Sequence, residues 1–321
     1  MTEFTCEINV ESGSNKHMLN FDIHGNEEYG MHHSIVNAIR RTLLSSIETY
    51  GFRNTDIIID KNETSLHNEF ITDRIGLLPL YLDTNLVQDN PLKYLFVLNV
   101  LHDNSKPITL ITAKDFDIYE LKKTITNSSD YINGQITTVS KDNYDLKKPV
   151  SDKLKEEIFR PYQYDKKSYY CLLHELKSTN SETEIQELVL YGSPSVSISK
   201  EDARFQGVSC ATYSFKIDPD LYKVVLKKKI EIDEIKEEDR KDYAKNFELK
   251  EGQRYYYRDN NTESYWYNFI IESQHYLNSK ELFIRANEII IDSLEGFKEE
   301  LSKILDCLLY TSDAADEEDS V

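Results

Sequence analysis

The chain has 321 residues, of which 39% are hydrophobic, so it is long enough for two domains that each bury a core. Its net charge of −19, without a basic face, argues against binding a nucleic-acid backbone unaided, because that binding relies on Lys and Arg. The four cysteines form no CxxC pair and no apolar run reaches about 18 residues, so a zinc ribbon, a disulfide framework and a membrane span are not expected.

The N-terminal part of the chain is expected to form a hairpin followed by a long helix. Residues 4–23 alternate weakly between apolar and polar, which predicts two strands on either side of the turn 12–15. A helix is predicted over 31–47, with Arg40 and Arg41 in its middle. Its apolar residues recur every three or four positions and line one face: Met31, Ile35, Ala38 or Ile39, Leu43 and Ile47.

The middle of the chain reads as short strands separated by polar loops. A strand is predicted at 56–60, a short helix at 68–75 and an extended segment at 77–80. Further strands are predicted at 94–100, 108–111, 169–173, 187–191, 211–217 and 265–273. The polar stretch 127–165 is expected to form surface loops, and the charge-rich stretch 227–254 a solvated, partly helical excursion.

A second long helix is predicted over 279–306. Its apolar residues step by four, three, four and three, which is heptad spacing; they are Ile290, Leu294, Phe297, Leu301 and Ile304. Each of these side chains is worth roughly 1.5–3 kcal/mol when fully buried. Spacing alone leaves two interpretations open: packing within the chain, or a seam shared with a second chain.

Three motifs follow one another between residues 34 and 82: Asn37-Ala38-Ile39-Arg40-Arg41, Asn62-Glu63-Thr64-Ser65, and the segment 69–80, which reads EFITDRIGLLPL. In this order they closely resemble the signature of the third-largest subunit of RNA polymerase II and of its polymerase I/III counterpart. The archaeal D subunit and, more distantly, the bacterial alpha subunit share it. The resemblance continues more weakly through 170–191, 201–205 and 266–305. Asp73 stands where the family has His, which leaves Arg74 as the expected structural contact.

The resemblance implies an α+β fold. A split dimerisation domain, an antiparallel sheet with two long helices, would comprise 1–60 and 205–306, interrupted by a mostly β insert domain at 61–204. The function implied is a non-catalytic assembly platform of DNA-directed RNA polymerase. It would pair with a small alpha-like subunit, separate or fused downstream, and dock the second-largest and other subunits. The alternatives are an alpha-like homodimer and, with less support, a stand-alone enzyme of unknown chemistry.

The candidate site residues follow from the two helices and the motifs. The residues expected to meet a partner are Ile35, Ile39, Arg40, Arg41, Leu43, Ile290, Leu294, Phe297, Leu301 and Ile304. Neighbours on a helix point about 100° apart, so one of the two arginines is expected to face the second-largest subunit. Residues expected to shape the fold are Asn37, Glu69, Phe70, Arg74, Gly76 and Pro79. Gly76 would supply a backbone conformation that other residues disfavour.

No catalytic residue, metal or cofactor is expected. Some relatives hold zinc or an iron–sulfur cluster through cysteines of the insert, which this insert lacks. His32 and His33 are adjacent and rarely would aim at one ion, and His67 stands apart. The paired acids at 237–239 lack apolar shelter, so a shifted pKa is not expected there. Neither sequence-specific nucleic-acid binding nor a membrane is expected among the interactions.

The last residues, 307–321, resemble the translation of a sequencing adapter, so we expect the natural reading frame to be lost after Asp306. Tyr, Asn, Lys and Ile are abundant and Gly and Pro scarce, which is typical of an AT-rich genome, as in large DNA viruses or some eukaryotes. The expected location is the nucleus, or a cytoplasmic virus factory or virion if the chain is viral.

Overall fold

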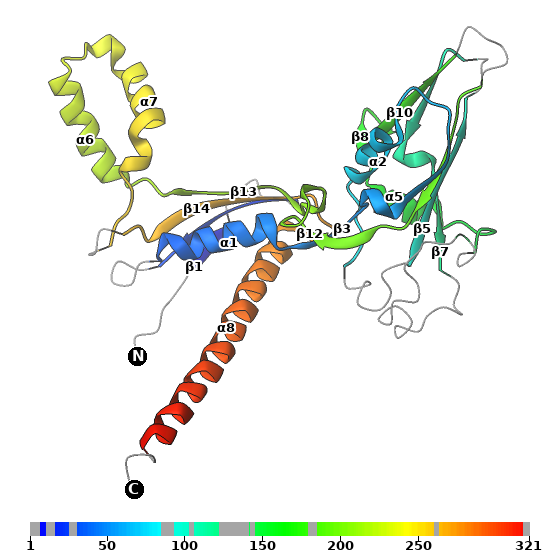
Figure 1. Cartoon of the computed structure of the whole chain (residues 1–321). Coiled ribbons are helices and arrows are strands. Elements are labelled where there is room, and N and C mark those ends of the chain that lie inside the picture. Colours follow the sequence, from blue (N-terminus) through cyan, green and yellow to red (C-terminus); the bar gives the residue numbers. More distant parts are fainter. Residues whose placement is uncertain are drawn as a thin grey trace. The chain divides into compact units, whose positions relative to one another are not determined.

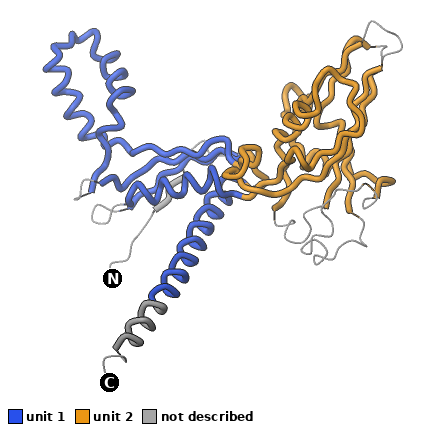
Figure 2. The backbone as a smooth tube through the Cα atoms, viewed as in Figure 1, with its two compact units in different colours: residues 1–47, 208–273, 278–321 blue, residues 48–207, 274–277 orange. Residues whose placement is uncertain are grey.

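The computed structural model describes residues 7–10, 17–25, 31–84, 93–102, 106–121, 141, 145–178, 185–259 and 263–316. The chain divides into two compact units, coloured separately in Figure 2. Unit 1 comprises residues 1–47, 208–273 and 278–321, and unit 2 comprises residues 48–207 and 274–277. Helices and antiparallel sheets occur in both units (Figure 1), so the fold is α+β as predicted.

Unit 1 is built on a four-stranded antiparallel sheet in the order β1-β2-β14-β13. Its strands are β1 (Glu7–Val10), β2 (Met18–His24), β13 (Val208–Phe215) and β14 (Trp266–Ser273). Strands from opposite ends of the chain pair in the middle of the sheet, where Ile23 lies opposite Tyr267. The predicted N-terminal hairpin is therefore present, although its turn lies outside the described residues.

Two helices pack on this sheet, namely α1 (His33–Ser45) and α8 (Ser279–Asp316). Alternate residues of β2 and β14, among them Phe21 and Phe269, are fully buried, as are Val36 and Leu43 of α1. Helix α8 contacts α1, β2 and β14, and its Phe283 ring meets Phe21 edge-on at 5.0 Å. The two long helices predicted from the apolar stripes therefore contact each other.

A helical hairpin joins β13 to β14 in unit 1 (Figure 1) and consists of α6 (Pro219–Ile232) and α7 (Arg240–Glu251). Asp218 caps α6 by accepting hydrogen bonds from the next backbone N–H groups, and Pro219 suits the first helical turn. Between the helices, Tyr222 and Phe247 bring their rings within 5.7 Å. The excursion predicted as partly helical over 227–254 thus begins earlier and is mainly helical.

The described residues of unit 2 form one four-stranded sheet, three two-stranded sheets and two α-helices. The larger sheet has the order β4-β11-β5-β7, and the ribbons pair β10 with β6, β12 with β3 and β8 with β9. The strands are β3 (Glu48–Gly51), β4 (Ile57–Asn62), β5 (Tyr94–Leu101), β6 (Ile108–Thr112), β7 (Phe116–Glu120), β8 (Tyr162–Tyr164), β9 (Lys167–Tyr169), β10 (Leu172–Lys177), β11 (Glu187–Gly192) and β12 (Ser195–Ile198). The helices are α2 (Asn68–Gly76) and α5 (Asp152–Phe159).

Aromatic rings fill much of the core of unit 2. Phe96 meets Phe52 at 5.2 Å and Phe116 at 6.1 Å, and Phe159 from the end of α5 lies 5.9 Å from Phe96. Helix α5 and strand β8 lie within the stretch 127–165 that was predicted as loops; residues 127–140 and 142–144 of that stretch lie outside the described part of the chain.

The units divide the chain at 47/48 and 207/208, whereas the resemblance implied divisions at 60/61 and 204/205. The first difference arises because β3 pairs with β12 and β4 pairs with β11, which ties both strands to unit 2. The short segment 274–277 also belongs to unit 2. There the Nε2 atom of the buried His275 donates to the carbonyl of Glu48 at 2.9 Å, while its Nδ1 accepts from the backbone N–H of Leu277.

Candidate partner-binding surface

The apolar stripe of α8 changes its surroundings along the helix. In the first two turns its residues pack into unit 1, where Leu282 and Ala286 are fully buried. Farther along, the same stripe is exposed: Leu294 is 62% exposed and Phe297 66%. We call Ile290, Leu294, Phe297, Leu301 and Ile304 the ridge; Ile290 is half-buried and the other four are exposed. These five residues lie on one face of α8, as the heptad spacing predicts.

Three more apolar residues widen the ridge. Ile284, Ile291 and Leu305 are all exposed and recur at multiples of seven residues, with Lys298 at the remaining position. They form a second stripe beside the first. Sequence reasoning missed this stripe, although the seven-residue spacing could have revealed it. The opposite side of the helix carries Glu288, Asp292, Glu295 and Glu299, so one side is apolar and the other charged.

The predicted contact residues of α1 differ in their exposure. Ile35 is half exposed, which leaves it available to a second molecule. Ile39 and Leu43 are buried in the core of unit 1 and contribute to its stability instead. The physical reason is that the stripe of α1 is the face covered by the chain itself. Partner contact through Ile39 and Leu43 is therefore not compatible with this packing.

The two arginines of α1 differ in how firmly their side chains are held. Arg40 donates from Nε and Nη2 to the Oδ1 atom of Asn37, one turn earlier, at 3.1 and 2.9 Å. These two hydrogen bonds hold the half-buried guanidinium against the helix surface. Arg41 is exposed. Asn37 therefore orients Arg40, which gives a role to two residues of the first motif.

Arg204 links the motif segment 69–80 to residues 52–54 within unit 2. Its Nη1 donates to the Phe52 carbonyl at 2.9 Å and to Asn54 Oδ1 at 2.7 Å. Its Nη2 lies 3.7 Å from Asp73, and its Nε lies 2.9 Å from Asp202 in an ion pair without hydrogen-bond geometry. Hydrogen bonding from the Arg204 backbone N–H, followed by the nearby guanidinium, lowers the pKa of Asp202. The guanidinium is thus surrounded by acceptors from three segments.

Gly76 leaves the space that Arg204 occupies. A Cβ atom at this position would lie 2.6 Å from Arg204 Nη1 and 3.0 Å from the Phe52 carbonyl oxygen. Its backbone has no positive φ, so the expectation that Gly76 supplies an unusual conformation is wrong. Glycine is required at this position by close approach, not by torsion.

The remaining motif residues have separate roles. Asn62 Oδ1 accepts from the backbone and hydroxyl of Thr64, and Asn62 Nδ2 donates to the Leu66 carbonyl, which shapes the turn before α2. Arg74 Nη1 donates to the Leu173 carbonyl at 2.6 Å, so α2 is tied to β10. Pro79 is half-buried in the extended segment after α2, while Glu69 and Phe70 are exposed. No ion pair links Glu69 to Arg74 among the residues described.

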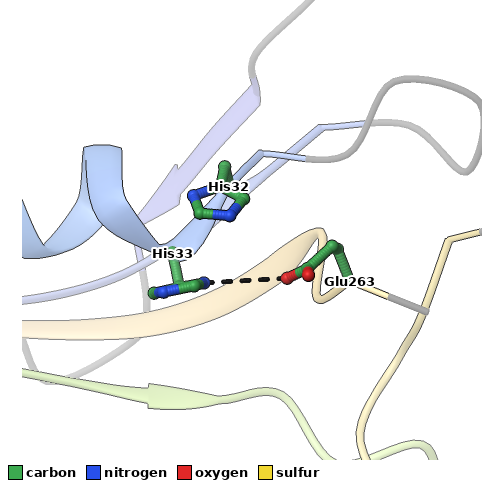
Figure 3. A group of neighbouring side chains, drawn as sticks. All are labelled: His32, His33 and Glu263. Atoms are coloured by element: carbon green, nitrogen blue, oxygen red, sulfur yellow. Dashed lines mark ion pairs between the residues drawn. The ribbon is translucent and has the colours of Figure 1, made fainter. Parts of the chain in front are cut away.

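One group of side chains has the composition of a metal site. Figure 3 shows His32, His33 and Glu263 side by side, with potential ligand atoms within 4.8 Å of one another. His33 Nδ1 lies 3.6 Å from a Glu263 carboxylate oxygen. However, His32 Nδ1 accepts from the backbone N–H of Ser34 and caps α1, which places the proton of the neutral ring on Nε2. His32 therefore serves the helix end, and all three residues are exposed.

Two buried titratable side chains, His275 and Tyr267, hydrogen-bond to backbone carbonyl groups. Burial lowers the pKa of His275 to about 4, despite its hydrogen bond to the Glu48 carbonyl. Burial also raises the pKa of Tyr267 to about 12, and its hydroxyl lies 2.8 Å from the carbonyl oxygens of both Met31 and Ser264, which share its single proton. Both side chains stay neutral near pH 7 and bridge backbone segments. Within the described ranges no helix has the length and apolarity needed to cross a membrane.

Comparison with known proteins agrees with this arrangement. Residues 27–294 match the family described as the RNA polymerase Rpb3/Rpb11 dimerisation domain. A conjugation stage-specific protein of Tetrahymena thermophila is 35% identical over 80 residues, which amount to 25% of this chain and 19% of that protein. The family match spans all of α1, strands β13 and β14, the whole described part of unit 2 and the start of α8 up to residue 294, whereas strands β1 and β2 precede it. Because the match covers most of the chain, the chain belongs to the RNA polymerase subunit family that carries this dimerisation domain.

Proposed function

We propose that the chain is a non-catalytic assembly platform of DNA-directed RNA polymerase that pairs through the ridge with a smaller subunit of similar fold. The observation that carries the proposal is the continuity of the α8 stripe, which is buried by unit 1 at Leu282 and exposed from Leu294 onward. Large apolar side chains exposed along several helical turns are removed from water only when they pack against another apolar surface. The family to which the chain belongs is described as a dimerisation domain, which supports pairing with another subunit.

We further propose that α1 docks the second-largest subunit through its arginines. Asn37 already restrains Arg40, so less side-chain entropy is lost when the guanidinium binds a carboxylate or carbonyl groups. Arg41 is exposed and offers a second cation. Such an assembly would work in the nucleus, or in a virus factory or virion if the chain is viral.

Co-expression with a small alpha-like polymerase subunit tests the pairing. We expect a one-to-one heterodimer by light scattering coupled to size exclusion. Leu294→Glu with Phe297→Glu should abolish it, because each charge would be buried without a partner. Glu295→Gln with Glu299→Gln, on the charged side of α8, is the matched control and should leave the heterodimer intact. A ridge variant that pairs as well as the unaltered chain would refute the proposal.

The same experiment separates the alpha-like homodimer from the heterodimer. A homodimer would form without the small subunit and would depend on the same ridge residues. A second double variant tests docking: Arg40→Ala with Arg41→Ala should still form the heterodimer but fail to retain the second-largest subunit on an affinity column. Retention at the unaltered level would exclude these arginines as the docking contact.

A further inference from the structure

A small hairpin in unit 2 is exposed on both of its faces. Strands β8 and β9 pair only with each other among the described strands, and every residue of both strands is exposed. An isolated two-stranded hairpin is marginally stable in water, because it cannot bury a hydrophobic face. The hairpin is nevertheless regular, with Tyr162 opposite Tyr169 and Tyr164 opposite Lys167.

The hairpin presents three tyrosines on one face. Tyr162 and Tyr169 are direct partners across the ribbon and Tyr164 lies two residues along, so all three side chains project the same way. They are 69%, 51% and 64% exposed, respectively. The other face carries Gln163 and Ser168, which hydrogen-bond to each other at 2.9 Å. One face is thus aromatic and the other polar.

The edges and the tip of the hairpin indicate what it could bind. In a hairpin with a two-residue turn, the pair next to the turn is hydrogen-bonded, so the backbone groups of Gln163 and Ser168 point outward at the two edges. An extended segment can pair with such an edge. At the tip, Lys166 and Lys167 form no ion pair within the described chain, against a single carboxylate at Asp165. The tip is positive on a chain whose net charge is −19.

We propose that the β8–β9 hairpin is a docking site for an extended acidic segment of another protein. The segment adds a strand at one edge, lays alternate apolar side chains over the tyrosines and places carboxylates near Lys166 and Lys167. Tyrosine is enriched in protein interfaces because it offers a large, rigid contact surface at low entropy cost. A protein segment is favoured over single-stranded nucleic acid, since two lysines beside Asp165 neutralise few phosphates. This site belongs to unit 2 and does not depend on the ridge of α8.

Fluorescence anisotropy on the full chain tests the proposal with a labelled octapeptide that alternates glutamate and valine. We expect it to bind at least about tenfold more tightly than the same peptide with lysine in place of glutamate. Lys166→Glu with Lys167→Glu, and separately Tyr162→Ser with Tyr164→Ser, should each weaken binding by about tenfold or more. Because these side chains are exposed, the variants should keep the circular dichroism spectrum and melting temperature of the unaltered chain.

The matched control is Lys241→Glu with Lys245→Glu, the same charge change on α7, and it should leave peptide binding unchanged. Equal binding by the unaltered chain and the hairpin variants would overturn the proposal. Tighter binding of a labelled oligothymidine than of the acidic peptide, lost in the same variants, would also overturn it in favour of a nucleic-acid site.

Discussion

Replacing Gly76 by alanine tests the close approach of α2 to Arg204. The added Cβ would lie 2.6 Å from Arg204 Nη1, so the guanidinium must move away. The side chain is flexible, and the cost lies in the hydrogen bonds to Phe52 and Asn54 that it gives up. Hydrogen bonds to charged groups contribute roughly 1.5–3 kcal/mol each. Since the displaced guanidinium regains some contacts with water, we expect Gly76→Ala to lower the free energy of unfolding by about 3 kcal/mol.

Urea denaturation measures this loss, and hydrogen exchange of α2 amides assigns it to unit 2. Gly296→Ala is the matched control, because a Cβ there meets nothing within 4 Å and removing an interior helical glycine stabilises by about 1 kcal/mol. In an Arg204→Met background the guanidinium contact is removed and the Phe52 carbonyl oxygen remains at 3.0 Å, so the cost of Gly76→Ala should fall to about 1 kcal/mol. A cost that is the same with and without Arg204 would refute the reasoning.

Three further predictions concern buried groups and the ridge. Tyr267→Phe removes a donor to two buried carbonyls and should cost about 1–3 kcal/mol in urea denaturation; an unchanged midpoint would contradict it. Because the pKa of His275 is about 4 when folded and 6.5 when unfolded, its neutral form stabilises the fold above pH 6.5, and about 3 kcal/mol is lost as the pH falls through 4. His275→Gln should flatten this part of the pH–stability curve, and an unaltered curve would exclude His275 as its source. Phe297→Ser should change the unfolding free energy of the monomer by less than about 0.5 kcal/mol. The same variant should weaken the heterodimer, as measured by titration calorimetry. A monomer destabilised as strongly as a core variant would show that the ridge is covered by the chain itself.

The long helices could be predicted because their apolar residues recur with helical spacing. The prediction 31–47 became α1 at His33–Ser45, and the prediction 279–306 is contained in α8. Periodicity identifies a buried face without saying which molecule buries it. For this reason Ile39, Leu43 and Phe297 were grouped together, although the first two lie in the core and the third is exposed.

The missed elements of unit 2 have weak local signals. Helix α5 has a Ser151 cap and apolar residues only at Leu154, Ile158 and Phe159, within a stretch dominated by charge. The β8–β9 turn uses Asp165 and Lys166 at positive φ where a glycine would have marked it. The role of Arg204 could not be predicted, because its side-chain hydrogen bonds go to Phe52 and Asn54, more than a hundred residues earlier in the chain.

The pairing of β2 with β14 also sets the order in which the protein can fold on the ribosome. Strand β2 and helix α1 are translated before residues 48–207, whereas strand β14 and helix α8, which pack against them, are translated after those residues. Residues 48–207 emerge in between and can form most of unit 2 during this interval. Before β14 and α8 are synthesised, Phe21, Ile23 and Leu43 lack the strand and helix that pack against their segment, so these apolar side chains are exposed to water during that interval.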